Sequence, residues 1–393
     1  MKFAHLSDCH IGGWREPKLR EANTKSFVMA IEKCLAEKVD FLLISGDLFN
    51  TAVPGIESLK MAVEQLKKLK DNGIPVYYIA GSHDFSPSGK TMLDVLEHAG
   101  LAVNVAKGEE LADNRIKLHF TVDKTGTKIT GMIGKKGGLE TSYYYQLAKE
   151  HLEKEEGYKI FMFHSALSEL KPKELEEMDA MAVSLMPKGF DYYAGGHVHV
   201  VDRADVGEYR NIVYPGPIFP NNFSEIEKLK HGSFVIVNDG EIKHTPLIVH
   251  PTVCISLDAE GKTAIEIEKE IMKIDNVANA IVTIRVQGCL KQGKPADIRW
   301  NDILHNIYSK NAYFAMKNTN ALTSKEIEVI MVKEANVEEV EEALIKEHAS
   351  QFKITDTELI KKMMHVLSTE KAEGERIADF EMRLQTDVDQ LLQ

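Results

Sequence analysis

The fold depends on one stretch, Phe41-Leu42-Leu43-Ile44-Ser45-Gly46-Asp47-Leu48-Phe49-Asn50. It opens with an apolar run that is long enough for a buried strand and too short for a helix. Buried strands of this kind belong to sheets that are covered on both faces. The run stops at Gly46-Asp47, and a carboxylate at the carboxyl end of such a strand lies where open α/β sheets bind ligands. Taken alone, the segment fits a strand followed by an ordinary turn aspartate equally well.

The segments on either side repeat the pattern. Residues 2–7 form a short apolar strand that ends at Asp8-Cys9-His10, and residues 74–80 form another that ends at Gly81-Ser82-His83-Asp84. Between the three strands, residues 19–37 and 56–69 place apolar side chains at helical spacing. Strand, helix, strand, helix, strand predicts a layered α/β domain.

Composition sets wider limits. The chain has 393 residues, which suits two or three domains, and 44% hydrophobic with 27% charged residues is ordinary for a soluble globular protein. No apolar run approaches the roughly 18–20 residues of a membrane span, and the amino terminus is too polar for a signal peptide. The four scattered cysteines form no Cys-x-x-Cys pair, which favours a reducing, cytoplasmic environment over a disulfide framework or a zinc finger.

The charge balance differs along the chain. The net charge of −12 argues at first against nucleic-acid binding. From Ala321 onward, 9 Lys and Arg against 17 Asp and Glu give −8, so the first 320 residues carry only −4. An acidic tail says little about the surface near a catalytic cleft, where metal ions can supply positive charge.

Later segments predict further strands and two more domains. Residues 159–163 form a strand that ends at His164, and residues 190–194 form one that ends at Gly195-Gly196-His197-Val198-His199. A β-rich run to residue 237 is followed by the hairpin signal Asn238-Asp239-Gly240. After His250-Pro251 the strands and helices alternate as in a small separate α/β unit. From residue 323 the chain is charged and helical, with a helix start at Asn336 and helices over residues 359–367 and 377–391. We expect domains at residues 1–250, 251–322 and 323–393.

Five predicted strands end in residues whose side chains can bind metals. The candidates are Asp8 with His10, Asp47, Ser82 with His83 and Asp84, His164, and His197 with His199. Singly, an Asp-x-His pair commonly has no function, and a lone histidine is commonly a hydrogen-bonded core residue. Together they should meet at one rim of the sheet. Mixed imidazole and carboxylate ligands favour Mn, Fe or Zn over Ca, and their number exceeds what one tetrahedral zinc needs and suits two metals about 3.5–4 Å apart.

The order Asp-x-His, Gly-Asp, Gly-x-His-Asp, His, Gly-His-x-His resembles the calcineurin-like binuclear metallophosphoesterases. Ser7 to Gly12, Ser45 to Phe49 and Tyr214-Pro215-Gly216 resemble one branch, the DNA double-strand-break repair nucleases of the Mre-eleven/SbcD type. The resemblance implies a two-layered β-sandwich flanked by helices, a small α/β DNA-capping domain and a C-terminal helical tail. It implies two Mn²⁺ ions, with Mg²⁺ or another divalent metal as the alternative. Implied partners are DNA, a Rad-fifty/SbcC-type coiled-coil ATPase docked on the tail, and a second copy of the chain in a homodimer, with no membrane.

The resemblance also implies roles for single residues. One metal would be held by Asp8, His10, Asp47 and His199, and the other by Asp47, Ser82, His164 and His197. His83 would contact the phosphate and assist the leaving oxygen, and Asp84 would orient His83. Two positions depart from the family. Ser82 stands where relatives have Asn, a better metal ligand, and Asn50 stands where some relatives have a second active-site His.

Three functions follow from these features. The first is a Mn-dependent DNA nuclease, double-strand exonuclease and single-strand endonuclease, in double-strand-break repair. The second is a metal-dependent phosphodiesterase for a small or cyclic nucleotide, against which the extra domain and tail count. The third is a scaffold with weak catalysis, for which Ser82 is the best support. Basic residues that suit phosphate contacts, or are simply solvated loop charges, are Lys135, Lys136 and Arg203.

Overall fold

The computed structural model describes residues 1–86, 91–171, 177–325, 359, 362–363, 366–369 and 377–391. The chain divides into two compact units, Met1–Ser324 and Lys325–Gln393. Of the helices in the described part, none combines the length and apolarity that crossing a bilayer requires.

The central strand of the first sheet is β2 (Phe41–Ser45), which is buried along its whole length. It pairs in parallel with β1 (Lys2–Leu6) on one side and with β3 (Val76–Ile79) on the other. The sheet has the order β14-β13-β1-β2-β3-β4. Its remaining strands are β4 (Val103–Asn104), β13 (Gly232–Asn238) and β14 (Glu241–Leu247). The β13–β14 turn has positive φ at Asp239 and Gly240, as the Asn-Asp-Gly signal predicts.

A second sheet of six strands has the order β11-β12-β10-β9-β8-β7. At its centre β9 and β10 run parallel, with Gly196 opposite His164. Its strands are β7 (Thr121–Val122), β8 (Lys128–Gly131), β9 (Lys159–His164), β10 (Tyr192–Gly196), β11 (Val201–Val206) and β12 (Tyr209–Pro215). A separate hairpin joins β5 (Gly108–Glu110) to β6 (Ile116–Leu118).

The two sheets pack face to face, which explains why the Phe41 run is apolar at every position. Phe41 and Leu43 belong to a core with Ile160 and Tyr192 of the second sheet. The alternate residues, Leu42 and Ile44, pack instead in a core shared with the helices. Replacing a side chain buried in such a core with Ala costs about 2–5 kcal/mol. The expected two-layered sandwich with flanking helices is therefore observed.

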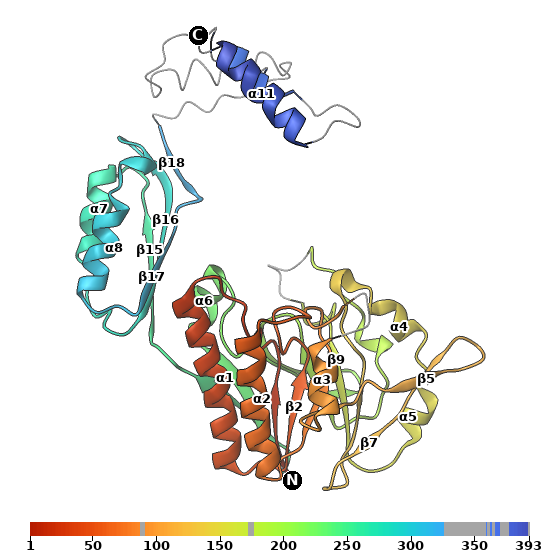
Figure 1. Ribbon diagram of the computed structural model, residues 1–393. Helices are drawn as coiled ribbons and strands as arrows, with labels where there is room; N and C mark the ends of the chain where they lie inside the picture. Colours follow the sequence, from red (N-terminus) through yellow and green to blue (C-terminus); the bar gives the residue numbers. More distant parts are fainter. Residues whose placement is uncertain are drawn as a thin grey trace. The chain divides into compact units, whose positions relative to one another are not determined.

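Helices cover the outer face of the first sheet. Figure 1 shows α1 and α2 side by side over it, with α3 beyond them. Helix α1 begins at a proline, which suits the first turn because proline has no N–H to leave unpaired. The helices of the sandwich are α1 (Pro17–Glu37), α2 (Ile56–Asp71), α3 (Met92–His98), α4 (Thr141–Tyr145), α5 (Glu150–Lys154) and α6 (Phe223–Leu229).

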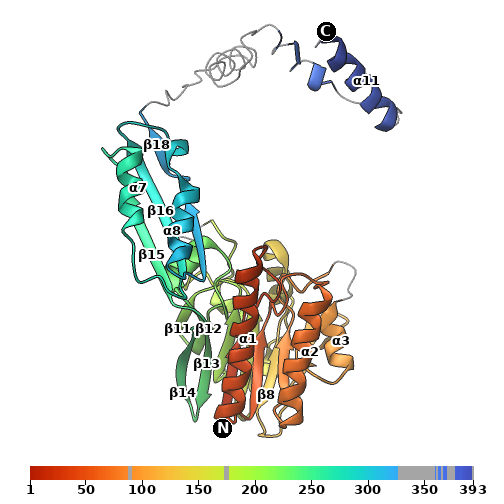
Figure 2. The ribbon, with the colours of Figure 1, turned by 60° about the vertical axis from the view of Figure 1, so that its left-hand side comes forward.

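A smaller α/β layer follows the sandwich. Its sheet consists of β15, β16, β17 and β18, all parallel to β16 where they pair with it. Figure 2 shows α7 and α8 along one face of this sheet. The bounds are β15 (Thr252–Asp258), α7 (Ala264–Met272), β16 (Ile281–Leu290), α8 (Trp300–Ser309), β17 (Phe314–Asn318) and β18 (Leu322–Ser324). Strand β18 extends the layer two residues past the expected end at residue 322. We name this layer the β15–β18 layer.

In the second compact unit the longest described helix is α11 (Ile377–Leu391). It matches the helix expected over residues 377–391. Phe380, Leu384 and Val388 are half-buried along one side of it. The expected helix start at Asn336 lies outside the described residues. Of the helix expected over residues 359–367, the structure describes residues 359, 362–363 and 366–367, all of them helical.

Candidate metal centre

The predicted ligand residues all follow the carboxyl ends of parallel strands. Asp8 and His10 follow β1, Asp47 follows β2, and Ser82, with His83 and Asp84 next to it, follows β3. In the second sheet His164 ends β9, and His197 with His199 follows β10. The two sheets share this edge, so nine positions scattered over the first 200 residues, including Ser82 and Asp84, meet at one place.

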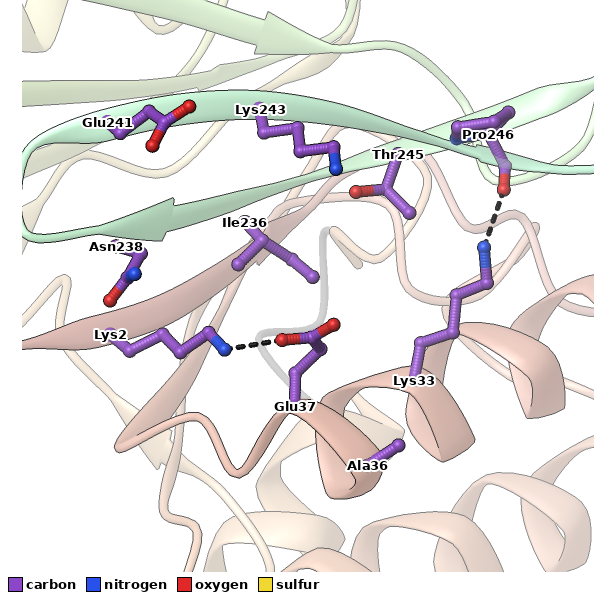
Figure 3. A pocket seen from close by; sticks show the side chains of 10 residues that line it. All are labelled: Lys2, Lys33, Ala36, Glu37, Ile236, Asn238, Glu241, Lys243, Thr245 and Pro246. Carbon is purple, nitrogen blue, oxygen red and sulfur yellow. Dashed lines mark hydrogen bonds and ion pairs between the residues drawn. The ribbon is translucent and has the colours of Figure 1, made fainter.

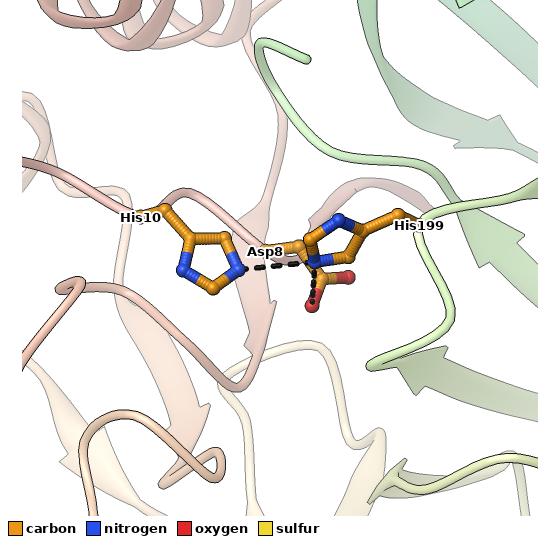
Figure 4. Close-up of side chains that lie close together, drawn as sticks. All are labelled: Asp8, His10 and His199. Carbon is orange, nitrogen blue, oxygen red and sulfur yellow. Dashed lines mark hydrogen bonds and ion pairs between the residues drawn. The ribbon is translucent and has the colours of Figure 1, made fainter. Parts of the chain in front are cut away.

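One cluster consists of Asp8, His10 and His199, drawn in Figure 4. The Nε2 atoms of His10 and His199 lie 3.0 Å apart. His199 Nε2 is 3.5 Å from the Asp8 Oδ1 atom. Two imidazole nitrogens and a carboxylate facing one another need a shared proton or a cation between them. The donor set therefore fits a divalent metal ion.

A second cluster is built around the Asp47 carboxylate. Its Oδ2 atom lies 3.2 Å from His164 Nε2 and 3.6 Å from His10 Nε2. Asp8, Asp47 and His164 also form a group whose ligand atoms lie within 4.8 Å of one another. Asp47 thus contacts histidines of both clusters, which is the position that a carboxylate bridging two metals would occupy.

Hydrogen bonds on the far side of two rings fix which nitrogen faces the centre. The Nδ1 of His164 donates to the Ser45 carbonyl at 2.8 Å. The Nδ1 of His199 pairs with Glu225 Oε1 at 3.0 Å. Both bonds leave Nε2 directed at the carboxylates, and such outer partners orient metal-binding histidines in many proteins.

The backbone at these residues is strained. Positive φ angles occur at Asp8 (50°), His10 (43°), Asp47 (51°), His197 (97°) and His199 (49°). Residues with side chains rarely adopt this conformation, which costs about 1–3 kcal/mol each, and it concentrates at functional sites. Its recurrence at five candidate ligands indicates that the fold stabilises this arrangement against the cost.

Glycines allow the loops to approach closely. A Cβ atom on Gly81 would lie 2.2 Å from Asp47 Oδ1, and one on Gly196 would lie 2.3 Å from the Ser45 carbonyl oxygen. Larger residues at either position would displace the loops that carry the ligands.

The surroundings of the centre shift the pKa values of its histidines in opposite directions. Burial opposes protonation of His164, but the Asp47 and Asp8 carboxylates outweigh it and raise the pKa of His164 to about 9. The pKa of His199 rises to about 10 for the same reason, with Asp8 and Glu225 as partners.

Burial lowers the pKa of His10 and of His197 to about 4 in each case. Despite burial, the facing histidines hold the pKa of Asp8 and of Asp47 well below the usual range. The carboxylates thus stay ionised and attract positive charge.

His83 lies at the edge of the centre. Its backbone N–H donates to Asp47 Oδ1 at 2.7 Å, and its Nδ1 donates to the Asn50 carbonyl at 2.8 Å. A ring nitrogen of His83 falls within 4.8 Å of the ligand atoms of His10 and Asp47. With Nδ1 engaged, Nε2 is the ring nitrogen available to a substrate.

The Asp84 carboxylate binds backbone N–H groups, and the His83 ring is held by another residue. Its carboxylate accepts hydrogen bonds from the backbone N–H groups of Leu48, Phe49 and Gly81, at 3.0–3.2 Å. Asn50, through its backbone carbonyl, fixes the His83 ring instead. The resemblance implied that Asp84 orients His83, but adjacent residues in a loop can point in different directions. Burial and Asp47 raise the pKa of Asp84 to about 6, against its backbone hydrogen bonds.

Ser82 and His197 lie at the centre with longer contacts. The Ser82 hydroxyl is 3.4 Å from Asp47 Oδ2. The His197 ring centroid is 5.1 Å from that of His164, and the His197 backbone N–H donates to the Asp8 carboxylate. Both side chains lie on the Asp47–His164 side, where the resemblance puts the second metal.

The basic residues predicted near the cleft differ in their surroundings. Lys135 lies over the rings of Tyr143 and Phe85. Phe85 is two positions after His83 in the chain. Lys136 is exposed. Arg203 donates to the Asn211 side chain on the outer strands.

Two pockets differ in their distance from the metal centre. One of about 580 Å³ borders the centre and includes His199 and Glu225 in its lining. The other, of about 440 Å³, lies at the amino end of β1, opposite Asp8. Figure 3 shows that its Lys2 pairs with Glu37 and that Lys33 donates to the Pro246 carbonyl. The second pocket is remote from the metal-binding residues.

Glu225 is the residue of the centre that the sequence did not reveal. It lies in α6, far along the chain from the ligand motifs. Asn222, three residues earlier, accepts from the Glu225 N–H as a helix N-cap. That spacing predicts a helix start, but it carries no signal that the carboxylate reaches His199.

Comparison with known proteins gives a consistent assignment. Residues 1–201 match the family model described as calcineurin-like phosphoesterase. A protein of Methanopyrus kandleri named DNA double-strand break repair protein Mre11 is 31% identical over 235 residues, 58% of this chain and 51% of that protein. The Archaeoglobus fulgidus protein of the same name is 23% identical over 387 residues, 95% of this chain and 82% of its own. The protein of the same name from Methanococcus maripaludis is 26% identical over 371 residues, which cover 88% of this chain and 91% of that protein. The chain thus spans about half of the first protein and most of the other two.

Proposed function

The chain belongs to the calcineurin-like phosphoesterase family and is a metal-dependent phosphoesterase, and from this premise we propose that it is a Mn²⁺-dependent DNA nuclease of double-strand-break repair. The proposal rests mainly on one observation, the convergence of the strand-end ligands and His83 on one rim. It is supported by the relatives named for DNA repair, since the similarity to the Archaeoglobus fulgidus protein covers 95% of this chain and extends far beyond the matched residues 1–201.

The residues at the rim divide into two ligand sets. Asp8, His10, Asp47 and His199 would hold one ion, and Asp47, Ser82, His164 and His197 the other. When bound, the metal pair supplies a water of lowered pKa and positive charge that stabilises a phosphate in its transition state. Mn²⁺ accepts this mixture of imidazole and carboxylate, and Mg²⁺ is the alternative.

The protein's own groups position the DNA phosphate and the protons. His83, held through Nδ1–H by the Asn50 carbonyl, presents Nε2 to the phosphate. In its doubly protonated form it would donate the Nε2 proton to the leaving oxygen and keep the Nδ1 proton. Asp84 holds the Leu48 and Phe49 backbone, and so keeps the Asp47 loop in place while the substrate binds. Lys135, supported by Tyr143, contacts a neighbouring phosphate.

The remaining parts have assigned roles in this proposal. Residues 251–322 cap the DNA, residues 323–393 dock a Rad-fifty/SbcC-type ATPase, and the enzyme acts as a homodimer. The tail from Ala321 has a net charge of −8, from 9 basic and 17 acidic residues, which disfavours phosphate binding. The half-buried apolar side of α11 suits a protein partner.

The test is incubation of the purified protein with duplex DNA, single-stranded DNA and a cyclic nucleotide, each with Mn²⁺, Mg²⁺ or a chelator. We expect nucleotide release from both DNA substrates with Mn²⁺ and none with the chelator. If the protein hydrolyses the cyclic nucleotide and leaves every DNA intact, it is a small-substrate phosphodiesterase instead. If it binds Mn²⁺ and cleaves nothing, it is a scaffold.

A further inference from the structure

Helix α6 (Phe223–Leu229) contacts the metal centre through Glu225. Glu225 Oε1 lies 3.0 Å from His199 Nδ1, and its Oε2 accepts from the Asn221 N–H at 2.8 Å. Glu225 is only about one-fifth exposed. Both carboxylate oxygens are therefore engaged, and the His199 ring can turn only if α6 moves or this bond breaks.

The same helix contacts the β15–β18 layer. Two residues after Glu225, Glu227 binds Arg285 of β16, with Nη2 and Nε at 2.5 Å and 3.0 Å from Oε2. The Arg285 guanidinium also lies 5.2 Å from the Phe223 ring centroid. Arg285 thus contacts two residues of α6 that lie about one helical turn apart, Phe223 and Glu227.

Apolar and backbone contacts reinforce this attachment. Ile226 packs with Ile281 of β16 and with Leu19 of α1 in one buried cluster. Thr252 of β15 donates to the Lys230 carbonyl just beyond the end of α6, at 2.5 Å. Since α6 has only seven residues, a displacement at Glu227 is carried to Glu225 along a single short hydrogen-bonded segment.

We propose that α6 couples the position of the β15–β18 layer to the metal centre, with Glu225 as the positioning residue for His199. With Arg285 on Glu227, Glu225 holds the His199 ring with Nε2 toward Asp8. When the layer moves away, α6 loosens and His199 is free to rotate. This inference rests on the proposed role of His199 as a metal ligand. It adds to that role a regulation of the centre by whatever moves the layer, such as a bound nucleic acid.

The size of the effect follows from the kind of contact. Removing an outer partner of a ligand histidine typically weakens metal binding about 10–100-fold. The contact between Arg285 and Glu227 does not touch a ligand histidine directly. Removing a contact of this kind changes the coupling between two sites between about 2-fold and about 30-fold. Glu225→Ala should therefore weaken Mn²⁺ binding more than Arg285→Glu does. Glu225→Gln keeps an oxygen that can accept from His199 Nδ1–H. Its Mn²⁺ affinity should therefore lie between that of Glu225→Ala and that of the unaltered protein.

The experiment is titration of the full chain with Mn²⁺ alone, with free Mn²⁺ counted from its electron paramagnetic resonance signal, so that no catalysis enters the measurement. We expect weaker binding in Glu225→Ala and in Arg285→Glu, which sets two carboxylates against each other. The double variant Arg285→Glu/Glu227→Arg restores an ion pair and should recover most of the lost affinity. No change in Arg285→Glu, or no recovery in the double variant, would overturn the coupling.

Two controls separate the possible failures. Arg299→Glu breaks a comparable ion pair in the same layer, with Glu268 of α7, but not at α6. It should leave Mn²⁺ affinity unchanged, and an equal loss there would overturn the coupling in favour of general destabilisation. Asp47→Ala should abolish binding of Mn²⁺ at the centre. If it binds Mn²⁺ as the unaltered protein does, the proposed centre itself fails, and not merely its link to α6.

Discussion

Asp47→Asn should abolish the stabilisation of the protein by Mn²⁺ while leaving the fold intact. Asp47 is buried, and its Oδ2 contacts both His164 and His10. The amide is nearly the same size, so packing is preserved. It carries no charge and offers a single, weaker oxygen where a bridge needs two. One substitution should therefore remove both metal ions.

The magnitude follows from mass action. A ligand that binds only the native state at 100 times its Kd stabilises that state by about 2.7 kcal/mol. For domains of 150–250 residues, each kcal/mol shifts Tm by about 2–4 °C. The unaltered protein should then gain roughly 5–11 °C when Mn²⁺ replaces chelator. Asp47→Asn should gain close to nothing, as measured by calorimetry or thermal fluorimetry.

Asp123→Asn is the matched control. Asp123 is also a buried carboxylate, but it accepts from Tyr77 OH and lies away from the ligand loops. The Asp123→Asn variant should have a lower Tm in chelator than the unaltered protein. Its Tm should still rise by the full amount when Mn²⁺ is added. A Mn²⁺-dependent gain in Asp47→Asn equal to that of the unaltered protein would refute the bridging role.

Other predictions test single parts of the centre and of the chain. His83→Gln should lower the DNA cleavage rate about 10²–10⁴-fold and keep the Mn²⁺-dependent Tm gain; loss of that gain would make His83 a ligand. Ser82→Asn should tighten the weaker Mn²⁺ site in a binding titration, because an amide oxygen reaches further than a hydroxyl; an unchanged isotherm would mean that Ser82 is already sufficient. Truncation after Lys325 keeps β18, which pairs with β16, so the product should cleave DNA with Mn²⁺ but no longer co-purify with the ATPase. Retention of the ATPase would show that the tail is not its docking segment.

The sequence predicted the central strands because their signals are local. The Phe41 run is apolar throughout because its alternate residues face two different cores, and the polar residues that follow mark where it ends. The ends of β1, β2, β3, β9 and β10 placed every candidate ligand at one rim. The small α/β layer after His250 also followed from periodicity.

Longer-range features left no such signal. Strands β7 and β8 of the second sheet are too short for a pattern, with two and four residues. The contact of Glu225 with His199 depends on how α6 packs, and the pairing of His83 with the Asn50 carbonyl involves the backbone, which any residue offers. The β15–β18 layer extends to Ser324 because Ser324 of β18 pairs with Leu290 of β16, which lies 34 positions earlier in the chain. These features depend on tertiary contacts and required the structure.

The most direct test of the two-metal centre is the number of Mn²⁺ ions bound per chain. The purified full-length protein would be stripped with chelator, titrated with Mn²⁺, and followed by electron paramagnetic resonance, which also detects spin coupling between neighbouring ions. Two ions per chain with a coupled signal, both lost in Asp47→Asn, is the predicted result. A single uncoupled ion per chain, or two ions that persist in Asp47→Asn, would contradict a centre bridged by Asp47.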